Sequence, residues 1–316
     1  KKFTLSFWCK KAGQGVDQFV FNSTTDANNR CQVQFSDADQ LDFICKVSGS
    51  NVARLKTTRK FRDPSAFYHI VAVLDTTQST NTDRIKLYIN GEQNLAADNG
   101  FASETYPSQN ADVDVSGTHT VGSYYNGSSA SNYFDGLLTH VHFTDGYAYQ
   151  ASTFGETDST SGIWSPKTAP SVTYGTNGFF LKFENSGAMG TDSSGQSNTF
   201  TPAGNLTQNV DSPTNNYAIL TPLYTIEYNS AQFFTNGSTT TNSNQTQWNT
   251  NPCTLEVSSG KWYFEGYGHT NGSHYVHYGI TSSAKMNANA TQAQSEINAN
   301  ANGYAYSYYG NSGNIY

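Results

Sequence analysis

Charged side chains are scarce in this sequence. Asp, Glu, Lys and Arg together make up 13% of its 316 residues, about half of the roughly 25% that is usual in globular proteins. The formal net charge is −7, and the Lys and Arg residues are scattered along the chain. Since the sequence offers no basic patch that could hold a phosphate backbone, we expect no nucleic-acid partner.

Long apolar runs are also missing. No stretch approaches the roughly 18–20 apolar residues that a membrane helix needs, so we expect no membrane segment. We also expect no signal peptide. The sequence begins at Lys1 inside an expected strand, without Met, and stops at Tyr316 without a closing strand. We therefore expect both ends to be cut from a longer protein.

Cysteine is rare, with four residues and no Cys-x-x-Cys pair. The absence of that pair argues against a zinc site. Cys9, Cys31 and Cys45 each alternate in step with the apolar residues of their expected strands, so they should point into a core. We expect buried free thiols that behave as small hydrophobic residues. The spacing leaves a disulfide open as the alternative.

Motifs for catalysis are absent as well. The sequence contains no Gly-x-Ser-x-Gly, no phosphate-binding loop and no His-Glu-x-x-His, which argues against the hydrolases and nucleotide enzymes that use them. Its few acidic residues lie mostly in expected turns, whereas a glycosidase needs two carboxylates facing one cleft. We expect a protein that is not an enzyme and that carries no cofactor.

Aromatic residues are abundant instead, at 14% of the chain, with 21 Tyr and 19 Phe. Together with Asn, Ser, Thr and Gly they favour strands and turns over helices. The clearest strands are 68–74 (YHIVAVL), which is apolar and β-branched, and 84–90 (RIKLYIN), which alternates strictly. A polar turn joins them, and Asn90-Gly91 predicts a further hairpin. We expect an antiparallel meander with one face in water.

Other strands are expected on both sides of this meander. The closing strand, 133–143 (YFDGLLTHVHF), places His140 and His142 on one face with Leu138. Two histidines at this spacing could chelate a metal, but no third ligand is evident, so we expect exposed or interface histidines. The further strands are expected at 3–10, 18–22, 31–35, 41–47, 119–123 and 178–183.

The segments "LYINGEQ" and "YFDGLLTHVHFTDGYAYQASTFGE" resemble the laminin-G-like, or concanavalin A-like, jelly roll. The resemblance implies a β-sandwich over residues 1–156. Laminin-G-like domains often bind calcium at the rim through carboxylates and carbonyls. The nearby acids do not converge by spacing, so calcium remains an open alternative to no cofactor. They are Asp112, Asp114, Asp135 and Asp145.

Residues 157–222 hold five of the eight prolines but also several large aromatic residues, so we expect an ordered connector rather than a mobile linker. Its end, "DSPTNNYAILTP" at 211–222, is similar to a connector in virion proteins of marine and freshwater tailed phages. The stretch 61–93 is similar to the same proteins. Residues 223–316 resemble an incomplete SPRY-like module: "SSGKWYFE" at 258–265 is similar to its opening strand, and "YVHYGITSSA" at 275–284 resembles the next strand.

The predicted fold is therefore all-β: two concanavalin A-like antiparallel β-sandwiches (jelly rolls) joined by an ordered Pro/Gly/Asn-rich connector. By resemblance, we expect a structural virion protein of an aquatic tailed phage, in a tail fibre, appendage or capsid decoration. It would act on the virion surface or outside cells, as a homo-oligomer, with a trimer favoured, together with other virion proteins. The alternatives are a carbohydrate-binding adhesin and a subunit of a non-viral extracellular fibre.

Sugar binding needs aromatic rings for stacking and amides for hydroxyl groups. The first of two candidate groups offers both. The second offers rings alone and could equally form a strand edge or subunit interface, where Tyr is enriched. Host-surface polysaccharide is therefore a further candidate partner. The residues are Tyr124, Tyr125, Asn126, Asn132 and Tyr133 in the first group, and Tyr304, Tyr306, Tyr308 and Tyr309 in the second.

Overall fold

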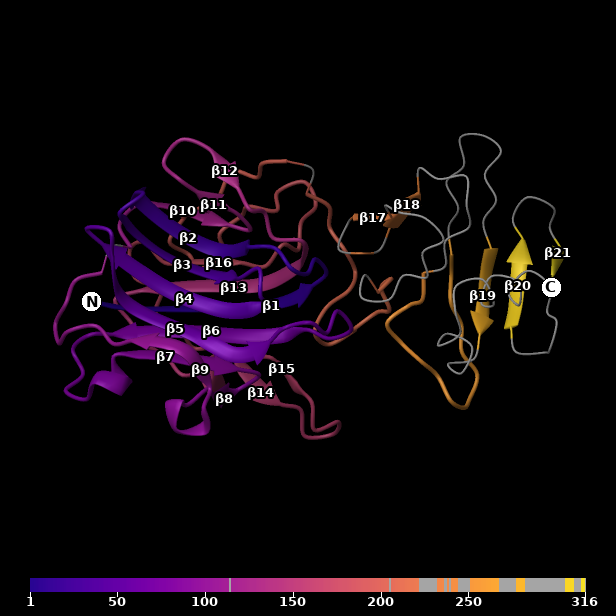
Figure 1. Ribbon diagram of the computed structural model, residues 1–316, viewed down its shortest axis with the longest axis horizontal. Helices are drawn as coiled ribbons and strands as arrows, with labels where there is room; N and C mark the ends of the chain where they lie inside the picture. The colour runs from indigo at the N-terminus through magenta and orange to yellow at the C-terminus, as the bar shows by residue number, and fades with distance from the viewer. Residues whose placement is uncertain are drawn as a thin grey trace. The chain divides into compact units, whose positions relative to one another are not determined.

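The architecture comes from a computed structural model of the chain (Figure 1). It describes residues 1–113, 115–204, 206–221, 232–235, 238, 240–243, 251–266, 277–281, 305–309 and 314–315. Apart from three one-turn 3-10 helices, the described elements are strands, which confirms the predicted all-β class. No helix in the described ranges is long and apolar enough to cross a membrane. The chain splits into two compact units, Lys1–Ala218 with Asn236–Ser238, and Ile219–Thr235 with Thr239–Tyr316.

The first unit contains two large antiparallel sheets, which we name sheet A and sheet B. Sheet A has the order β16-β13-β1-β6-β7-β8 and includes the predicted meander as β6 and β7. The expectation that one face of this meander lies in water was wrong for β6, which is buried on both faces. Asn90 and Gly91, both at positive φ (50° and 89°), turn the chain from β7 into β8 as predicted. The strands of sheet A are β1 (Lys2–Lys11), β6 (Tyr68–Asp75), β7 (Ile85–Ile89), β8 (Glu92–Gln93), β13 (Gly136–Asp145) and β16 (Phe179–Leu181).

Sheet B has the order β10-β2-β3-β4-β5-β9. Its central strands follow one another in sequence and are joined by tight turns, so it is a meander with β9 and β10 added at the edges. Its strands are β2 (Gln18–Asp26), β3 (Asn29–Phe35), β4 (Gln40–Val47), β5 (Ser50–Lys60), β9 (Phe101–Thr105) and β10 (Thr118–Val121).

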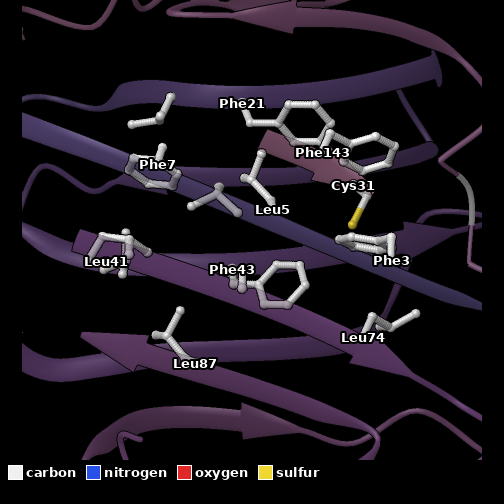
Figure 2. Close-up of a cluster of buried hydrophobic side chains, with 14 of the residues drawn as sticks. Phe3, Leu5, Phe7, Phe21, Cys31, Leu41, Phe43, Leu74, Leu87 and Phe143 are labelled. Atoms are coloured by element: carbon white, nitrogen blue, oxygen red, sulfur yellow. The ribbon is translucent and has the colours of Figure 1, made fainter. Parts of the chain in front are cut away.

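The core lies between the two sheets, and Figure 2 shows part of this buried cluster. Alternate residues of β1 enter it, among them Phe3 and Phe7, and meet Phe43 from sheet B. The rings of Phe3 and Phe43 pack edge to face, with centroids 5.9 Å apart. Because each fully buried aromatic or aliphatic side chain contributes about 1.5–3 kcal/mol, this one core can hold both sheets together.

Cys9, Cys31 and Cys45 lie in this core, as their alternation predicted, whereas Cys253 is exposed. Cys9 is a free thiol, and its burial raises its pKa. Cys31 and Cys45 instead form a disulfide, so the expectation of free thiols was wrong for these two. They lie directly opposite each other in β3 and β4, in a register set by the turn between the strands. Alternation shows which face a residue takes, but only the register shows which residue it meets.

The outer side of sheet A is covered by the chain that follows β13. A 3-10 helix (η3, Ala151–Thr153) and a hairpin of β14 (Gly155–Thr157) and β15 (Trp164–Pro166) belong to this layer. A second apolar cluster forms beneath it, from Val71, Val73, Tyr88, Ala151 and Phe154, with Tyr149, Trp164 and Val172 packed against them.

Lys10 of β1 points to the outer side of sheet A, where it is buried and binds the chain at residues 211–217. Its buried ammonium donates to Asp211 Oδ2 (2.8 Å), Asn216 Oδ1 (2.7 Å) and the Tyr217 carbonyl (2.6 Å). These are the three donors that an ammonium has. The connector is thus tied to the first sandwich along its length, also through β16, whose Leu181 pairs with Val141 of β13. The predicted boundaries at 156 and 222 stay predictions.

The second unit contains a hairpin of β17 (Gln232–Thr235) and β18 (Thr240–Ser243) and a sheet of β19 (His277–Thr281), β20 (Ala305–Tyr309) and β21 (Asn314–Ile315). The strand predicted at 258–265 was wrong, because residues 251–266 form no strand. The chain bends there at Gly260, with φ 96°, and Trp262 Nε1 donates back to the Ser259 carbonyl. The SPRY-like second sandwich remains a prediction.

Candidate functional site

The outer face of sheet B is polar, and the strand registers arrange its side chains in three rows. Since Cys31, Val33 and Phe35 enter the core, their neighbours on β3 point outward, and the partners of those neighbours on β2, β4 and β5 do the same. We call this surface the polar face. Its rows are Thr24, Arg30 and Lys46; Asn22, Gln32, Ile44 and Arg54; and Phe19, Gln34, Asp42 and Lys56.

Hydrogen bonds hold these polar groups in place. Arg30 Nε donates to Gln32 Oε1 (2.9 Å), and Gln32 Nε2 donates to Gln34 Oε1 (3.2 Å), which makes a chain along β3. Arg54 forms a two-point pair with Asp42, at 3.0 and 2.6 Å. Donation to the Asp42 carboxylate raises the pKa of Arg54. Side chains that are ordered before binding lose less entropy when a ligand arrives.

A small hairpin of β11 (Tyr124–Tyr125) and β12 (Ala130–Ser131) borders the polar face beside β2 (Figure 1). The ring of Tyr124 packs on Phe19, with centroids 4.8 Å apart, and the Arg30 guanidinium lies 5.8 Å from its centre. Asn22 Nδ2 donates to the Tyr125 carbonyl (3.0 Å). The hairpin is therefore fastened to the same side of sheet B that carries the polar rows.

The structure brings the first group of predicted sugar-binding residues together on this hairpin. Its two asparagines also stabilise the local turns. Asn126 Oδ1 accepts from the Ser128 and Ser129 backbone N–H groups, and the backbone of Asn132 takes a left-handed φ of 48°. Tyr133 is 64% exposed, so its ring is open to a ligand. The group consists of Tyr124, Tyr125, Asn126, Asn132 and Tyr133. Their role in binding remains a prediction.

The second predicted group lies in the other unit. Tyr306, Tyr308 and Tyr309 belong to β20, which pairs with β19 and β21. Tyr304 lies outside the described residues. Sequence reasoning had not found the polar face itself. Strict alternation of Arg30, Gln32 and Gln34 with buried neighbours was the signal that could have indicated it.

The four acids considered for calcium do not form a cluster where they are described. Asp145 Oδ2 accepts from Asn177 Nδ2 (2.7 Å), and Asp135 has its pKa raised by burial. Asp112 is exposed, and Asp114 lies outside the described residues. Within the described ranges, no three His, Cys, Asp or Glu side chains are placed to hold a metal.

His140 and His142 both lie against Phe180, but Leu138 packs against the core, so the prediction that they share its face was wrong. The expectation of an exposed histidine was also wrong for His142. Ser6 pairs with His142 and Trp8 with Thr139, so two residues of β13 stand opposite one residue of β1. This is a β-bulge, with His140 at a positive φ of 48°. The extra residue reverses the alternation. Val141 then enters the core, and His142 turns to the outer side of sheet A, where it is buried and stacks on Phe180, with centroids 3.8 Å apart.

A serine and a histidine also meet on the outer side of sheet A, an arrangement that can activate a nucleophile. Ser6 Oγ lies 2.9 Å from His69 Nε2, and Trp164 Nε1 donates to His69 Nδ1 (2.9 Å). Because indole can only donate, Nδ1 is the acceptor, and the proton of this neutral ring sits on Nε2. Ser6 therefore accepts from His69 and is not deprotonated by it. Burial lowers the pKa of His69 to about 3, with repulsion from His140 adding to the effect.

Comparison with known proteins agrees with this architecture. Residues 1–152 match a laminin-G family model described as the concanavalin A-like lectin/glucanases superfamily. The predicted laminin-G-like resemblance is thereby confirmed for the first sandwich. A comparison with curated proteins finds no match.

Several solved structures are similar at low identity. The heptameric SAP-like pentraxin of Limulus polyphemus is 14% identical, with a TM-score of 0.34, over 47% of this chain and 65% of its own. The CBM40 of the Ruminococcus gnavus IT-sialidase, bound to α2,3-sialyllactose, is 12% identical (TM-score 0.32; 44% and 72%). Domains LG4-5 of the mouse laminin α1 chain are 7% identical (TM-score 0.32; 45% and 35%). At these identities the likeness concerns the fold, and no ligand of this chain follows from it.

Proposed function

We propose that the protein is a carbohydrate-binding module of the adhesin type, without enzymatic activity, and that it holds glycans on the polar face. The observation that carries this proposal is the hydrogen-bonded chain of Arg30, Gln32 and Gln34 along β3, on the outer side of sheet B. The hairpin of β11 and β12 lies at its border. Amides and guanidinium groups match the hydroxyl groups of sugars as donors and acceptors.

The chemistry of this face suits binding better than hydrolysis. Asp42 is the acid in its rows, and both of its oxygens are engaged by Arg54. A carboxylate held in this way is a poor proton donor or nucleophile, and a glycosidase needs a second one across the bond. Tyr133 on the neighbouring hairpin offers an exposed ring for stacking against a sugar.

A glycan array followed by calorimetric titration of the hits tests this proposal on the full chain. We expect Gln34→Ala and Tyr133→Ala each to weaken binding about tenfold, the effect of losing one hydrogen bond or stacking contact worth about 1.4 kcal/mol. Tyr147→Ala is the matched control, since Tyr147 is 41% exposed but follows β13 of sheet A. Absence of any glycan hit, or equal losses in all three variants, would refute the proposal.

A second candidate is a structural virion protein of an aquatic tailed phage, which acts by homo-oligomeric assembly, trimeric in the favoured case, and by display at the host surface with other virion proteins. Support comes from the phage-like segments 61–93 and 211–222 and from the tight anchoring of the latter by Lys10. The Cys31–Cys45 disulfide suits a virion surface or another extracellular place. A trimer or hexamer in light scattering would support assembly, and a monomer at all concentrations would contradict it.

A further inference from the structure

Basic side chains that are scattered in the sequence gather on the polar face. Arg30 comes from β3, Lys46 from β4, and Arg54 and Lys56 from β5, all directed away from the core. The chain as a whole has a net charge of −7. Since Asp42 is the acid in the same rows, the face is positive within an acidic protein.

Two of these cations oppose each other directly. Arg30 and Lys46 are register partners across β3 and β4. Like charges in this position destabilise a sheet, because their side chains emerge close together on the same face. Among the described residues, the ion pairs do not include Arg30, Lys46 or Lys56. Asp42, the acid that could offset them, is already paired with Arg54.

The environment of Lys46 shows the cost of this arrangement. Partial burial lowers its pKa, and repulsion from Arg30 and Arg54 lowers it further. Arg30 is held rigidly in the same place, because it donates to Gln32 and to the Ala27 carbonyl and lies over the ring of Tyr124. A fold gains nothing from fixing one cation opposite another. Local arrangements that work against stability are characteristic of functional sites.

We propose that the polar face selects an anionic glycan, a polysaccharide whose carboxylate or sulfate groups sit between Arg30 and Lys46. This inference rests on the proposed carbohydrate-binding function and names its ligand class. Neighbouring strands are about 4.8 Å apart, so both cations can reach one anionic group. Gln34, half-buried in the third row, then serves the hydroxyl groups of the same polysaccharide.

The test compares two double variants that have the same net charge. Arg30→Gln with Lys46→Gln removes the opposed cations, and Lys86→Gln with Lys182→Gln removes two cations from the sheet A side, near Asp83 and Glu184. Calorimetric titration of the full chain uses polygalacturonate as the carboxylate probe, dextran sulfate as the sulfate probe, and dextran as the neutral probe. Comparison of the two anionic probes tells which anion is preferred.

We expect the wild type to bind at least one anionic probe, and the Arg30/Lys46 variant to bind it about tenfold or more weakly, as for loss of charge-assisted hydrogen bonds. The Lys86/Lys182 variant should stay within about twofold of the wild type, since remote surface charges are screened. The melting temperature of the Arg30/Lys46 variant should equal or exceed that of the wild type, because the opposed charges are gone.

Other results would overturn the inference. Equal losses in both double variants would indicate a general charge effect, and a lower melting temperature of the Arg30/Lys46 variant alone would indicate a structural pair. Duplex DNA bound as tightly as the polysaccharides would indicate a nonspecific polyanion site. Binding of dextran or other neutral glycans alone would refute the anionic preference but leave the carbohydrate-binding proposal standing. No binding of any glycan would refute both.

Discussion

The two sheets of the first unit share one core but differ in what lies on their outer sides. On sheet A, Trp8, His69 and His142 are buried beneath the chain that follows β13. On sheet B, Arg30, Gln34 and their neighbours form a polar network bordered by one hairpin. The covered side of sheet A contributes to stability. On the outer side of sheet B the basic residues and Gln34 are half-buried, so that side can carry recognition without weakening the core.

The sequence of each strand reflects this difference. β6 (YHIVAVLD) is apolar at nearly every position, as befits a strand that is buried on both faces. β3 (NRCQVQF) alternates polar and apolar residues from Arg30 onward, and on its outer face Arg30 and Gln34 are half-buried. Substitutions on the two outer faces should therefore have opposite consequences, large for stability on sheet A and large for binding on sheet B.

The largest effect on stability is expected from Lys10→Met, on the covered side. The change leaves the Asp211 carboxylate buried without its cation, which should lower the free energy of unfolding by about 4 kcal/mol. Urea denaturation measures this. Lys182→Met is the control, because its pair with Glu184 is exposed and should contribute less than about 1 kcal/mol. Equal stabilities of the two variants would show that Lys10 does not anchor the connector.

Removal of Phe154 should have the next largest effect. This ring is buried against sheet A in the second apolar cluster. Phe154→Ala should cost about 3 kcal/mol, from lost burial and the cavity left behind. Ile163→Ala, in the neighbouring hairpin loop and 60% exposed, should change stability by less than about 0.5 kcal/mol. If the two substitutions had similar effects in urea denaturation, the layer over sheet A would not be a packed one.

Acid should destabilise the covered side through its buried histidines. The pKa of His69 is about 3 in the folded protein, against about 6.5 when unfolded. Between these values the unfolded chain binds the extra proton. The stability is therefore full above about pH 6.5 and falls as the pH drops toward 3, by at most about 1.4 kcal/mol per pH unit and group. The same direction holds for His142, whose pKa burial also lowers.

The variant His69→Gln tests whether His69 causes this sensitivity to acid. Glutamine can still accept from Trp164 and donate to Ser6, but it does not titrate. Denaturation at pH 7 and pH 5 should show a smaller loss of stability for the variant than for the wild type. An unchanged difference between the two pH values would assign the acid sensitivity to other groups.

The smallest effect on stability is expected on the polar face. Gln34→Ala removes the side-chain oxygen that accepts from Gln32 Nε2. Because Gln34 is half-buried, this should lower the free energy of unfolding by about 0.5 kcal/mol. The same variant should bind glycan about tenfold more weakly, as proposed above. A loss of several kilocalories per mole without any change in binding would remove the distinction between the two outer faces.

Much of the first sandwich could be predicted because its signals are local. The strands at 68–74 and 84–90 were visible from β-branched content and alternation, and the inward direction of Cys9 followed from the same period. The strand at 178–183 appeared as β16. The strand at 258–265, which was expected from the resemblance to a SPRY-like opening strand, does not form, and the chain bends there at Gly260.

The sequence by itself determined the all-β class, the likeness to laminin-G-type sandwiches and the face that most core residues take, because each depends on residues close together in the chain. The tertiary structure alone decided three further matters: the Cys31–Cys45 disulfide, the bulge that turns His142 out of the core, and the opposition of Arg30 and Lys46. All three depend on the register between strands. Register is set by the whole sheet, so no single strand encodes it.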